Sequence, residues 1–243
     1  AQANQVDVVT IDGIIDPVDA EFITKIIKGS TSARAECLII QMDTPGGLDL
    51  AMRSIIKEMM RADIPVIVYV SPGGARAASA GALITIAAHI AAMAPGTNIG
   101  AAHPVALGGG KMDEEMAAKV ENDAAAYAES IATKRNRNKE WAIKAVRESV
   151  SITETEALKV KVIDLIAANV NDLLAQIDGR EVNTEAGVKT LDTKNSTVNY
   201  IEMGLREKIL NTLSNPNIAY ILFLVGLLGL YFELSNPGAI FPG

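Results

Sequence analysis

Two short segments of the chain carry residue types that suit acyl transfer, the chemistry that breaks an amide or an ester bond. They are Asp43-Thr44-Pro45-Gly46-Gly47 and Arg76-Ala77-Ala78-Ser79-Ala80-Gly81. Each follows an apolar, β-branched run and precedes a stretch with a helical pattern. A diglycine turn leaves backbone N–H groups bare, and a serine at a strand-to-helix corner can act as a nucleophile. We therefore expect the amides of Gly47 and Ala80 to form an oxyanion hole beside Ser79.

A serine nucleophile needs a base, and histidine is scarce, with only His89 and His103 in the chain. His89 lies between an apolar helix and a strand, which favours a structural role. His103 follows a predicted strand end and can line a cleft beside Ser79. A serine–histidine triad that uses His103 therefore stays open as an alternative.

The other base available to a serine is a lysine whose pKa is lowered by burial. Lys119 lies in the middle of a predicted helix, among small and apolar residues that allow close packing. Glu115 and Asp123 stand four residues before and after it, where either carboxylate can pair with the ammonium and keep it protonated. On the residues alone, Lys119 is either a base or an ordinary solvated lysine.

Composition limits the classes of protein to which the chain can belong. Of its 243 residues, 49% are hydrophobic and 21% are charged, and the net charge is −7. These values exclude a disordered chain and a polytopic membrane protein, and they argue against nucleic acid as the main partner. The sequence has no metal-ligand cluster and no nucleotide-binding motif, so we expect neither a metal nor a cofactor. The single cysteine, Cys37, lies in an apolar run and is expected to be buried.

Predicted strands and helices alternate along the first 170 residues, which indicates parallel strands with right-handed crossovers and hence an α/β layered fold. Ligand sites in such sheets gather at the carboxyl ends of the strands, where both motif segments lie. Residues 180–200 are predicted to form a polar hairpin or flap, and residues 200–213 a linking helix. The predicted strands are 6–11, 37–42, 65–70, 91–93 and 162–166, and the predicted helices are 16–28, 48–62, 79–88, 112–135, 139–149 and one from about 155.

The C-terminal part of the chain contains an uncharged apolar run from Ile218 to Phe232. Counted from Leu213, its length approaches that of a membrane-spanning helix. A buried core helix or dimer helix is the alternative. We expect residues 1–200 to form one domain with its core at 6–170, and residues 201–243 to hold the linker and a first membrane span at about 213–232.

The side of the membrane on which the domain lies is indicated by two conflicting features. The start Ala1-Gln2-Ala3 has the small-x-small pattern of a signal-peptidase site, which favours an extracytoplasmic domain. Arg206 and Lys208 precede the apolar run, which favours the opposite orientation. We expect the extracytoplasmic placement, and we expect the ending Asn236-Pro237-Gly238 to lead into further helices of a longer protein.

Taken together, the motifs resemble those of the membrane-bound serine protease domain of NfeD-type proteins, the stomatin operon partners. That family lies in the Clp protease/crotonase superfamily and is akin to signal peptide peptidase A. The resemblance covers about residues 6–170. It is carried by Asp43-Thr44-Pro45-Gly46-Gly47, Ala78-Ser79-Ala80-Gly81, Met93-Ala94-Pro95-Gly96-Thr97-Asn98-Ile99-Gly100, and Lys119 with Asn122-Asp123-Ala124.

The resemblance implies a crotonase-like fold and a Ser-Lys dyad, with Ser79 as nucleophile and Lys119 as base. It also implies an oxyanion hole at Gly47 and Ala80, and a membrane-anchored endopeptidase that cleaves apolar segments of stomatin-like partners. We expect Gly46, Leu48 and His103 to line the peptide site, and a homodimer or larger assembly. Two alternatives remain: a crotonase-like acyl-CoA enzyme, and a non-catalytic scaffold for a membrane partner.

Overall fold

The computed structural model describes residues 4–105, 113–214 and 216–235 of the chain. The chain divides into two units, residues 1–202 and residues 203–243. The first unit contains all the strands of the described structure and seven helices, and the second contains two helices.

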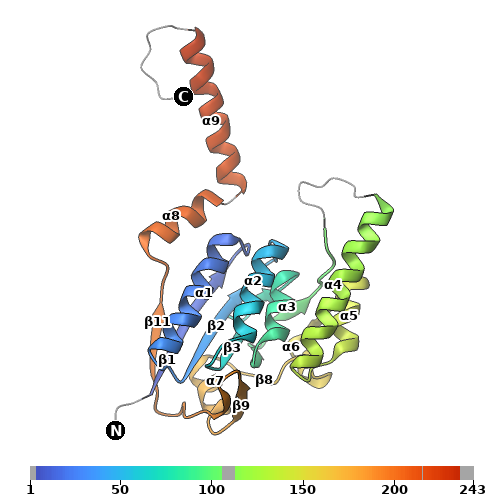
Figure 1. Cartoon of the computed structure of the whole chain (residues 1–243), viewed down its shortest axis with the longest axis vertical. Coiled ribbons are helices and arrows are strands. Elements are labelled where there is room, and N and C mark those ends of the chain that lie inside the picture. Colours follow the sequence, from blue (N-terminus) through green and yellow to red (C-terminus); the bar gives the residue numbers. More distant parts are fainter. Residues whose placement is uncertain (1–3, 106–112, 215, 236–243) are drawn as a thin grey trace. The chain divides into compact units, whose positions relative to one another are not determined.

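A parallel six-stranded sheet forms the centre of the first unit (Figure 1). Its strand order is β11-β1-β2-β3-β5-β8. These strands are β1 (Gln5–Asp12), β2 (Cys37–Asp43), β3 (Val66–Val70), β5 (Ile90–Met93), β8 (Leu165–Ile166) and β11 (Thr197–Ile201). All of β3 and β5 is buried, as expected of parallel strands that are covered on both faces. The predicted α/β layered fold is therefore confirmed.

Helices cover both faces of this sheet. One face carries α1 (Pro17–Ser32), α2 (Asp49–Met60) and α3 (Ala80–Ala87), which pack in sequence, α1 against α2 and α2 against α3 (Figure 1). On the other face, α7 (Val170–Ile177) packs into a core that includes Val8, Ile39 and Tyr69. The remaining helices of this unit are α4 (Glu114–Lys134), α5 (Lys139–Arg147) and α6 (Glu154–Lys159).

Two smaller sheets complete the first unit. Strands β4 (Arg76–Ala77), β6 (Asn98–Gly100) and β7 (Ser151–Thr153) form a three-stranded sheet next to the end of β2. Strands β9 (Glu181–Thr184) and β10 (Gly187–Thr190) pair as an antiparallel hairpin. In the second unit, α8 is Leu205–Ser214 and α9 is Pro216–Ser235.

Some element predictions need correction. Residues 197–201 were predicted to lie partly in a flap and partly in a helix, but they form β11, which pairs in parallel with β1. The Asn199 amide donates a hydrogen bond of 2.8 Å to the buried carboxylate of Asp7, which fixes this edge strand. The linking helix therefore begins at Leu205 rather than at Tyr200, and the last predicted strand of the core is only Leu165–Ile166.

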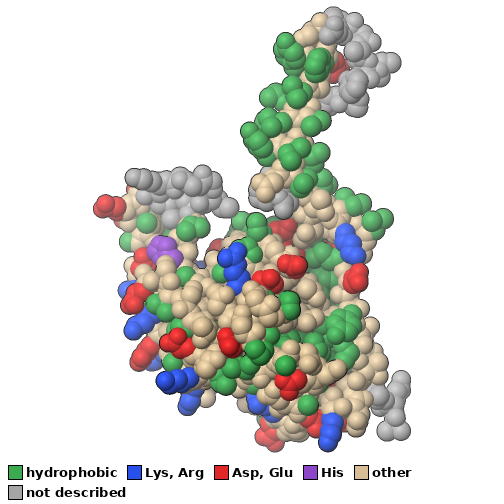
Figure 2. Space-filling model, turned by 180° about the vertical axis from the view of Figure 1, so that it is seen from behind, with side chains coloured by type: hydrophobic (Ala, Val, Ile, Leu, Met, Phe, Trp, Pro, Cys, Tyr) green, Lys and Arg blue, Asp and Glu red, His purple; other side chains and the backbone are tan. Residues whose placement is uncertain are grey.

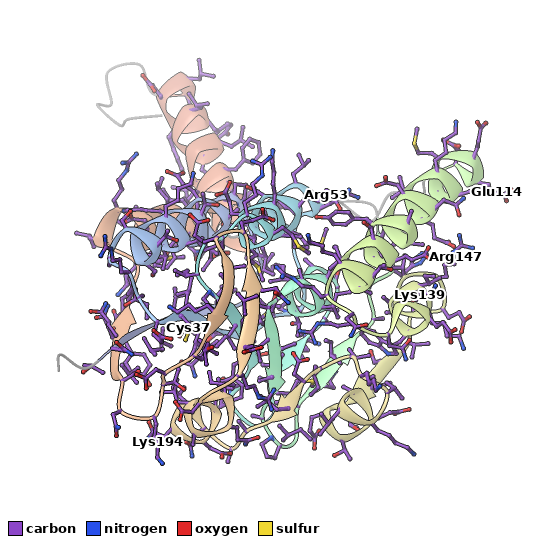
Figure 3. The ribbon with its side chains drawn as sticks, turned by 60° about the horizontal axis from the view of Figure 1, so that its bottom comes forward. Cys37, Arg53, Glu114, Lys139, Arg147 and Lys194 are labelled. Carbon is purple, nitrogen blue, oxygen red and sulfur yellow. The ribbon has the colours of Figure 1, made fainter. Side chains whose placement is uncertain are left out.

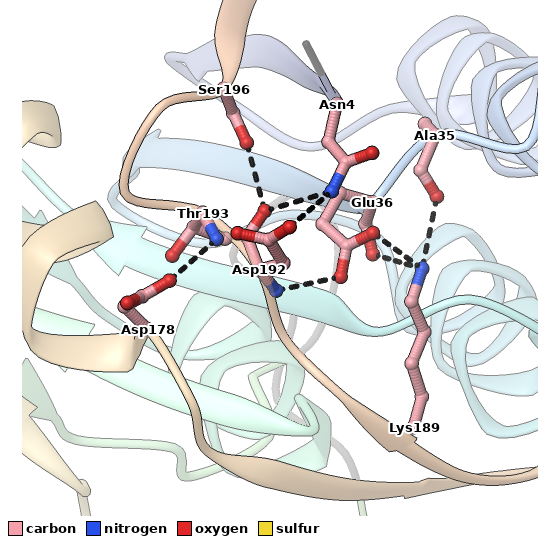
Figure 4. A network of polar contacts seen from close by, with 8 residues as sticks. All are labelled: Asn4, Ala35, Glu36, Asp178, Lys189, Asp192, Thr193 and Ser196. Atoms are coloured by element: carbon pink, nitrogen blue, oxygen red, sulfur yellow. Dashed lines mark hydrogen bonds and ion pairs between the residues drawn. The ribbon is translucent and has the colours of Figure 1, made fainter. Parts of the chain in front are cut away.

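A network of polar contacts ties the segment after the hairpin to the start of β2 (Figure 4). Lys189 forms an ion pair of 3.2 Å with Glu36, and the other Glu36 oxygen accepts from the amide of Asp192 at 2.9 Å. The Asp178 carboxylate accepts from the amide of Thr193 at 2.8 Å. The two contacts of Glu36 join residues more than 150 positions apart, so the polar segment is docked on the sheet.

Two titratable side chains in the first unit show the effect of burial on pKa. Cys37 is fully buried in β2, as predicted, and burial raises the pKa of its thiol to about 12. His89 accepts a hydrogen bond of 3.1 Å from the amide of Val66 through Nδ1. Burial, with help from the positive charge of Arg135, lowers the pKa of His89 to about 3. His89 is therefore neutral in the folded protein and has a structural role.

The depressed pKa of His89 predicts a pH dependence of stability. An unfolded histidine binds a proton near pH 6.5, whereas folded His89 does so only near pH 3, so acid favours unfolding in between. The free energy of unfolding should fall by up to about 1.4 kcal/mol per pH unit over this window. Urea titrations at a series of pH values, followed by the fluorescence of Trp141, give the free energy of unfolding at each pH. Plotted against pH, this free energy should change less steeply for His89→Gln than for the wild-type chain. Equal slopes for wild type and His89→Gln would contradict this assignment.

Candidate active site

The two glycine and serine segments meet beyond the carboxyl ends of β2 and β3. The amide of Thr44 donates to the carbonyl of Arg76 at 2.8 Å, and the amide of Ala78 donates to the carbonyl of Thr44 at 3.1 Å. Residues 44 and 77 form a parallel bridge. The loop after β2 therefore runs beside the segment that leads into Ser79, as the position of both motifs at the same edge of the sheet predicted.

Gly46 lies directly against Ser79. A Cβ atom at residue 46 would be 2.5 Å from the Ser79 Cβ and 3.1 Å from its Oγ, and Gly46 has a φ of +122°. The Thr44 hydroxyl fixes this turn, because it accepts from the Gly46 amide at 2.9 Å and donates to the Gly46 carbonyl at 3.0 Å. Only glycine meets both the steric and the conformational requirement at this position.

Ser79 occupies a sharp corner immediately before α3. Its φ of 52° and ψ of −118° are rare for a residue with a side chain, and such strain costs about 1–3 kcal/mol. The Ser79 amide donates to the carbonyl of Ala101 at 2.6 Å, which holds the corner against the chain that follows β6. The side chain is half-buried, and its hydroxyl has no hydrogen bond to any other described residue. In enzymes of the α/β-hydrolase fold, a strained corner of this kind presents the nucleophilic hydroxyl at the top of a sheet.

The two amides predicted to bind an oxyanion donate no hydrogen bond to any described residue. Ala80 is the first residue of α3, so its N–H has no carbonyl partner one turn earlier and lies at the positive end of the helix. Gly47 bridges Ile15, but that bridge uses the amides of Ile15 and Leu48, each at 2.9 Å, and leaves the Gly47 N–H unused. Both donors are thus available to a developing negative charge.

The backbone around these amides is closely packed. A Cβ atom at Gly47 would be 2.1 Å from the carbonyl oxygen of Ile15, and one at Gly81 would be 2.4 Å from a methyl carbon of Thr44. Every residue of α3 is buried. Glycine at these positions lets the loop and the helix approach to backbone contact distance, which fixes the relative placement of the amides.

Two arginines hold the opposite end of α3. Arg137 is buried and donates to the carbonyls of Ile86 and Ala88 at 3.1 Å each, and it pairs with Asp164 at 2.7 Å. Arg135 donates to the carbonyl of Ala87 at 2.7 Å. These cations satisfy the carbonyls that a helix leaves unpaired at its C-terminus. The helix that begins beside Ser79 is therefore fixed at both ends.

Lys119 lies on the first half of α4 and is a solvent-exposed lysine, one of the two possibilities that the sequence left open. Its Nζ pairs with Glu115 Oε1 at 2.6 Å, and the side chain is 66% exposed. Burial along α4 begins only at Ala124, so the small residues near Lys119 do not desolvate it. Among the described residues, no hydrogen bond joins Lys119 to Ser79. The ion pair with Glu115 was one of the two pairings foreseen from the spacing.

A cluster that the sequence analysis missed connects α4 with α2. Figure 3 shows Arg53 reaching from α2 toward α4. Its guanidinium pairs with Asp49 at 2.8 Å and with Asp123 at 2.5 Å, and it lies 4.2 Å from the ring centroid of Tyr127. Asp123 is four residues after Lys119, on the same face of α4. The spacing of Asp49 and Arg53 is visible in the sequence, but their partner on α4 is not.

The predicted peptide-binding residues have different surroundings. Gly46 is buried against Ser79, and Leu48 is the half-buried residue that precedes α2. His103 is exposed, and its Nδ1 lies 2.9 Å from the carbonyl oxygen of Val146. In the described part of the chain, no hydrogen bond joins His103 to Ser79. Part of the glycine-rich segment after His103, residues 106–112, lies outside the described residues.

The described residues also bear on metal chemistry. Within residues 4–105, 113–214 and 216–235, no group of three or more His, Cys, Asp and Glu side chains is arranged to hold a metal ion. The chemical groups at the candidate site are the Ser79 hydroxyl and the backbone amides of Gly47 and Ala80. The Lys119 amine lies on α4, where it is paired with Glu115.

Two relatives match nearly the whole of this chain. It is 36% identical over 239 residues to the membrane-bound protease PH1510 of Pyrococcus horikoshii, and 30% identical over 243 residues to the membrane protein NfeD1b of Bacillus subtilis. These matches cover 97% and 100% of this chain, but 54% of each relative. The chain therefore spans about half the length of both relatives.

Solved structures agree with the sequence relatives. A lysine-to-alanine mutant of the 1510-N membrane-bound stomatin-specific protease, in complex with a substrate peptide, matches with a TM-score of 0.79 and 34% identity. That match covers 86% of this chain and 97% of the other. A serine-to-alanine mutant of the same protease matches with a TM-score of 0.78, over 84% of this chain and 100% of the other.

The family model described as the N-terminal domain of NfeD1b matches residues 5–201, which covers both motif segments, Lys119 and the whole of the parallel sheet. By this match and the two sequence relatives, the chain belongs to the NfeD1b N-terminal domain family.

Proposed function

We propose that the chain is the peptide-cleaving part of a membrane-bound serine protease in which Ser79 is the nucleophile. The observation that carries the proposal is the packing of Gly46 against the strained Ser79 corner, with the Gly47 and Ala80 amides left without partners among the described residues. The protease names of the P. horikoshii relative and of the solved structures support it.

The proposed reaction proceeds through an acyl-enzyme. The Ser79 Oγ attacks the peptide carbonyl carbon, and the displaced electron pair moves to the oxygen, where the amides of Gly47 and Ala80 bind it. Lys119 takes the hydroxyl proton and gives it to the leaving amine as the C–N bond breaks. In the second half, Lys119 takes a proton from a water molecule whose oxygen adds to the acyl carbon of the ester. The bond between that carbon and the Ser79 Oγ then breaks, Lys119 gives the proton from water to the Ser79 oxygen, and the product leaves as a carboxylic acid that ionises in solution. No cofactor is needed for any of these steps.

The role of Lys119 rests on similarity and on its place in the chain. In the solved mutants, the replaced serine and the replaced lysine are separated by one residue more than Ser79 and Lys119 are. For Lys119 to accept a proton, its amine must leave Glu115 and reach the Ser79 hydroxyl. The working site therefore requires a rearrangement of the first half of α4 or of the Lys119 side chain.

The substrate that we propose is an apolar segment of a membrane-associated protein such as a stomatin-like partner. Exposed apolar side chains occur on the segments that meet at Ser79 or run beside it: Ile14, Leu50, Val105 and Met116. The relative's description as stomatin-specific supports the same class. A homodimer or larger assembly, and an extracytoplasmic position of the protease unit, belong to this proposal. Proteolysis of the unit in sealed cells reports its side of the membrane.

The first prediction concerns the dyad. Ser79→Ala and Lys119→Ala should each lower kcat for an apolar peptide by about 10⁴-fold or more, because residues that act as one unit lose activity together. Glu115→Gln should keep the activity or raise it at neutral pH, because the amine no longer has to leave an ion pair. Peptide turnover and labelling by a fluorophosphonate, which marks an activated serine, provide the measurements.

The outcomes separate the proposed function from its alternatives. A scaffold or an acyl-CoA enzyme would leave Ser79 unlabelled in the wild-type chain. Full activity of Lys119→Ala, together with loss of activity in His103→Ala, would show that His103 and not Lys119 is the base, and hence that the site is a triad rather than a dyad.

The second prediction concerns the contact between the two loops. Gly46→Ala places a methyl group against Ser79 and requires an unfavourable φ, so it should lower kcat by on the order of 10²-fold. Gly29→Ala is the matched control, because nothing lies within 4 Å of a Cβ at that position. Peptide turnover with the thermal midpoint checked in parallel is the measurement. Wild-type turnover in folded Gly46→Ala would remove this loop from the site.

The third prediction concerns the cluster that joins α2 to α4. Arg53→Met removes two ion pairs and the contact with Tyr127, so α4 should lose its fixed position beside α2. We expect kcat to fall by about 10-fold or more through displacement of Lys119, and amide exchange in residues 114–123 to become faster. Lys57→Met removes the same charge from an exposed site one turn later on α2 and should change neither quantity. Unchanged exchange in Arg53→Met would refute the positioning role.

A further inference from the structure

Helix α8 has an exposed apolar face. Its ten residues include none that is buried. The apolar side chains recur at helical spacing along one side and are largely exposed: Leu205 at 77%, Ile209 at 51%, Leu210 at 41% and Leu213 at 45%. The other side carries Glu207, Lys208, Asn211 and Thr212. Such an arrangement is typical of a helix whose apolar face is covered by a partner.

The position of α8 in the chain identifies that partner. Helix α8 ends at Ser214, and the segment that is long and apolar enough to cross a membrane begins at Asn217. Three residues reach about 10 Å at most, so the C-terminal end of α8 cannot be far from the end of the span. Figure 2 shows apolar side chains along the length of α9, whose 19-residue candidate span carries a mean hydropathy of 2.0.

We propose that α8 lies flat in the headgroup region of the bilayer, with its apolar face toward the acyl chains. Ten helical residues extend about 15 Å, so an upright α8 would lift Leu205 well out of the bilayer and leave its apolar face in water. A flat α8 covers all four apolar side chains and leaves the polar side in the aqueous layer.

Charge is consistent with this placement. Lys208 lies on the polar side, where it can meet the phosphate groups of lipids. Arg206 lies within the apolar side, between the positions of Leu213 and Leu210 around the helix, and its side chain is long enough to carry the guanidinium up to the headgroups. The first unit ends at Glu202, three residues before α8 begins, so the chain would leave the first unit close to the membrane surface.

The experiment places an environment-sensitive fluorophore on single introduced cysteines of the full chain in phosphatidylcholine–phosphatidylglycerol vesicles. Leu205→Cys and Ile209→Cys report the apolar face, and Asn211→Cys is the control on the polar face. Cys37 is buried in β2 and remains unlabelled, which the wild-type chain verifies. Quenching is measured with a lipid that carries a nitroxide just below its headgroup, and with iodide in the water.

The proposal expects the lipid nitroxide to quench residues 205 and 209 alike, at least about twofold more than residue 211, and iodide to show the reverse order. Quenching by lipid at residue 209 but not at residue 205 would mean that α8 stands upright, and would overturn the proposal. Protection of 205 and 209 from both quenchers would assign the apolar face to a protein surface, either a second copy or the protease unit, and would also overturn it. Equal lipid quenching at all three positions would contradict a flat, one-sided helix.

Discussion

The close approach of Gly46 to Ser79 is the constraint on which the candidate site depends. Neither loop can move toward the other or bear a larger residue, because a Cβ at residue 46 would already overlap the serine. The Thr44 hydroxyl closes the glycine turn, and the carbonyl of Ala101 anchors the serine amide. Because this packing fixes the backbone, the two amides, which lack partners among the described residues, are held in place before a substrate arrives.

Much of this part of the site was predictable from the sequence because it depends on local chemistry and one general rule. Diglycine and a serine before an alanine-rich helix indicate the proposed donors and the proposed nucleophile, and parallel strands bring their carboxyl ends to one edge. The capping of α1 by Asp16, with Pro17 in its first turn, was visible in the same way. What the sequence does not reveal is the strain at Ser79, since its φ of 52° results from long-range packing.

The packing of the first half of α4 and the strand β11 were not predictable, for a common physical reason. Each is decided by contacts between segments distant in the chain. Small neighbours on α4 allow close packing, but whether a helix packs there depends on what lies opposite, and burial begins only at Ala124. Likewise, the short polar strand Thr197–Ile201 has a weak pattern of its own, and it is placed by the bond between Asn199 and Asp7 across the sheet.

The proposed mechanism therefore uses one part of the site that is rigid and another part that must rearrange. The donors that stabilise the oxyanion lie on closely packed backbone, whereas the amine that moves the proton lies on an exposed half-helix paired with Glu115 and tied to α2 through Arg53 and Asp123. Under this mechanism, binding of a peptide must supply the free energy that brings the amine to Ser79. A peptide whose binding does not bring the Lys119 amine to Ser79 would occupy a site with a complete oxyanion hole but no base. Such a peptide would be cleaved with a lower kcat, so the enzyme would select substrates through kcat as well as through binding affinity.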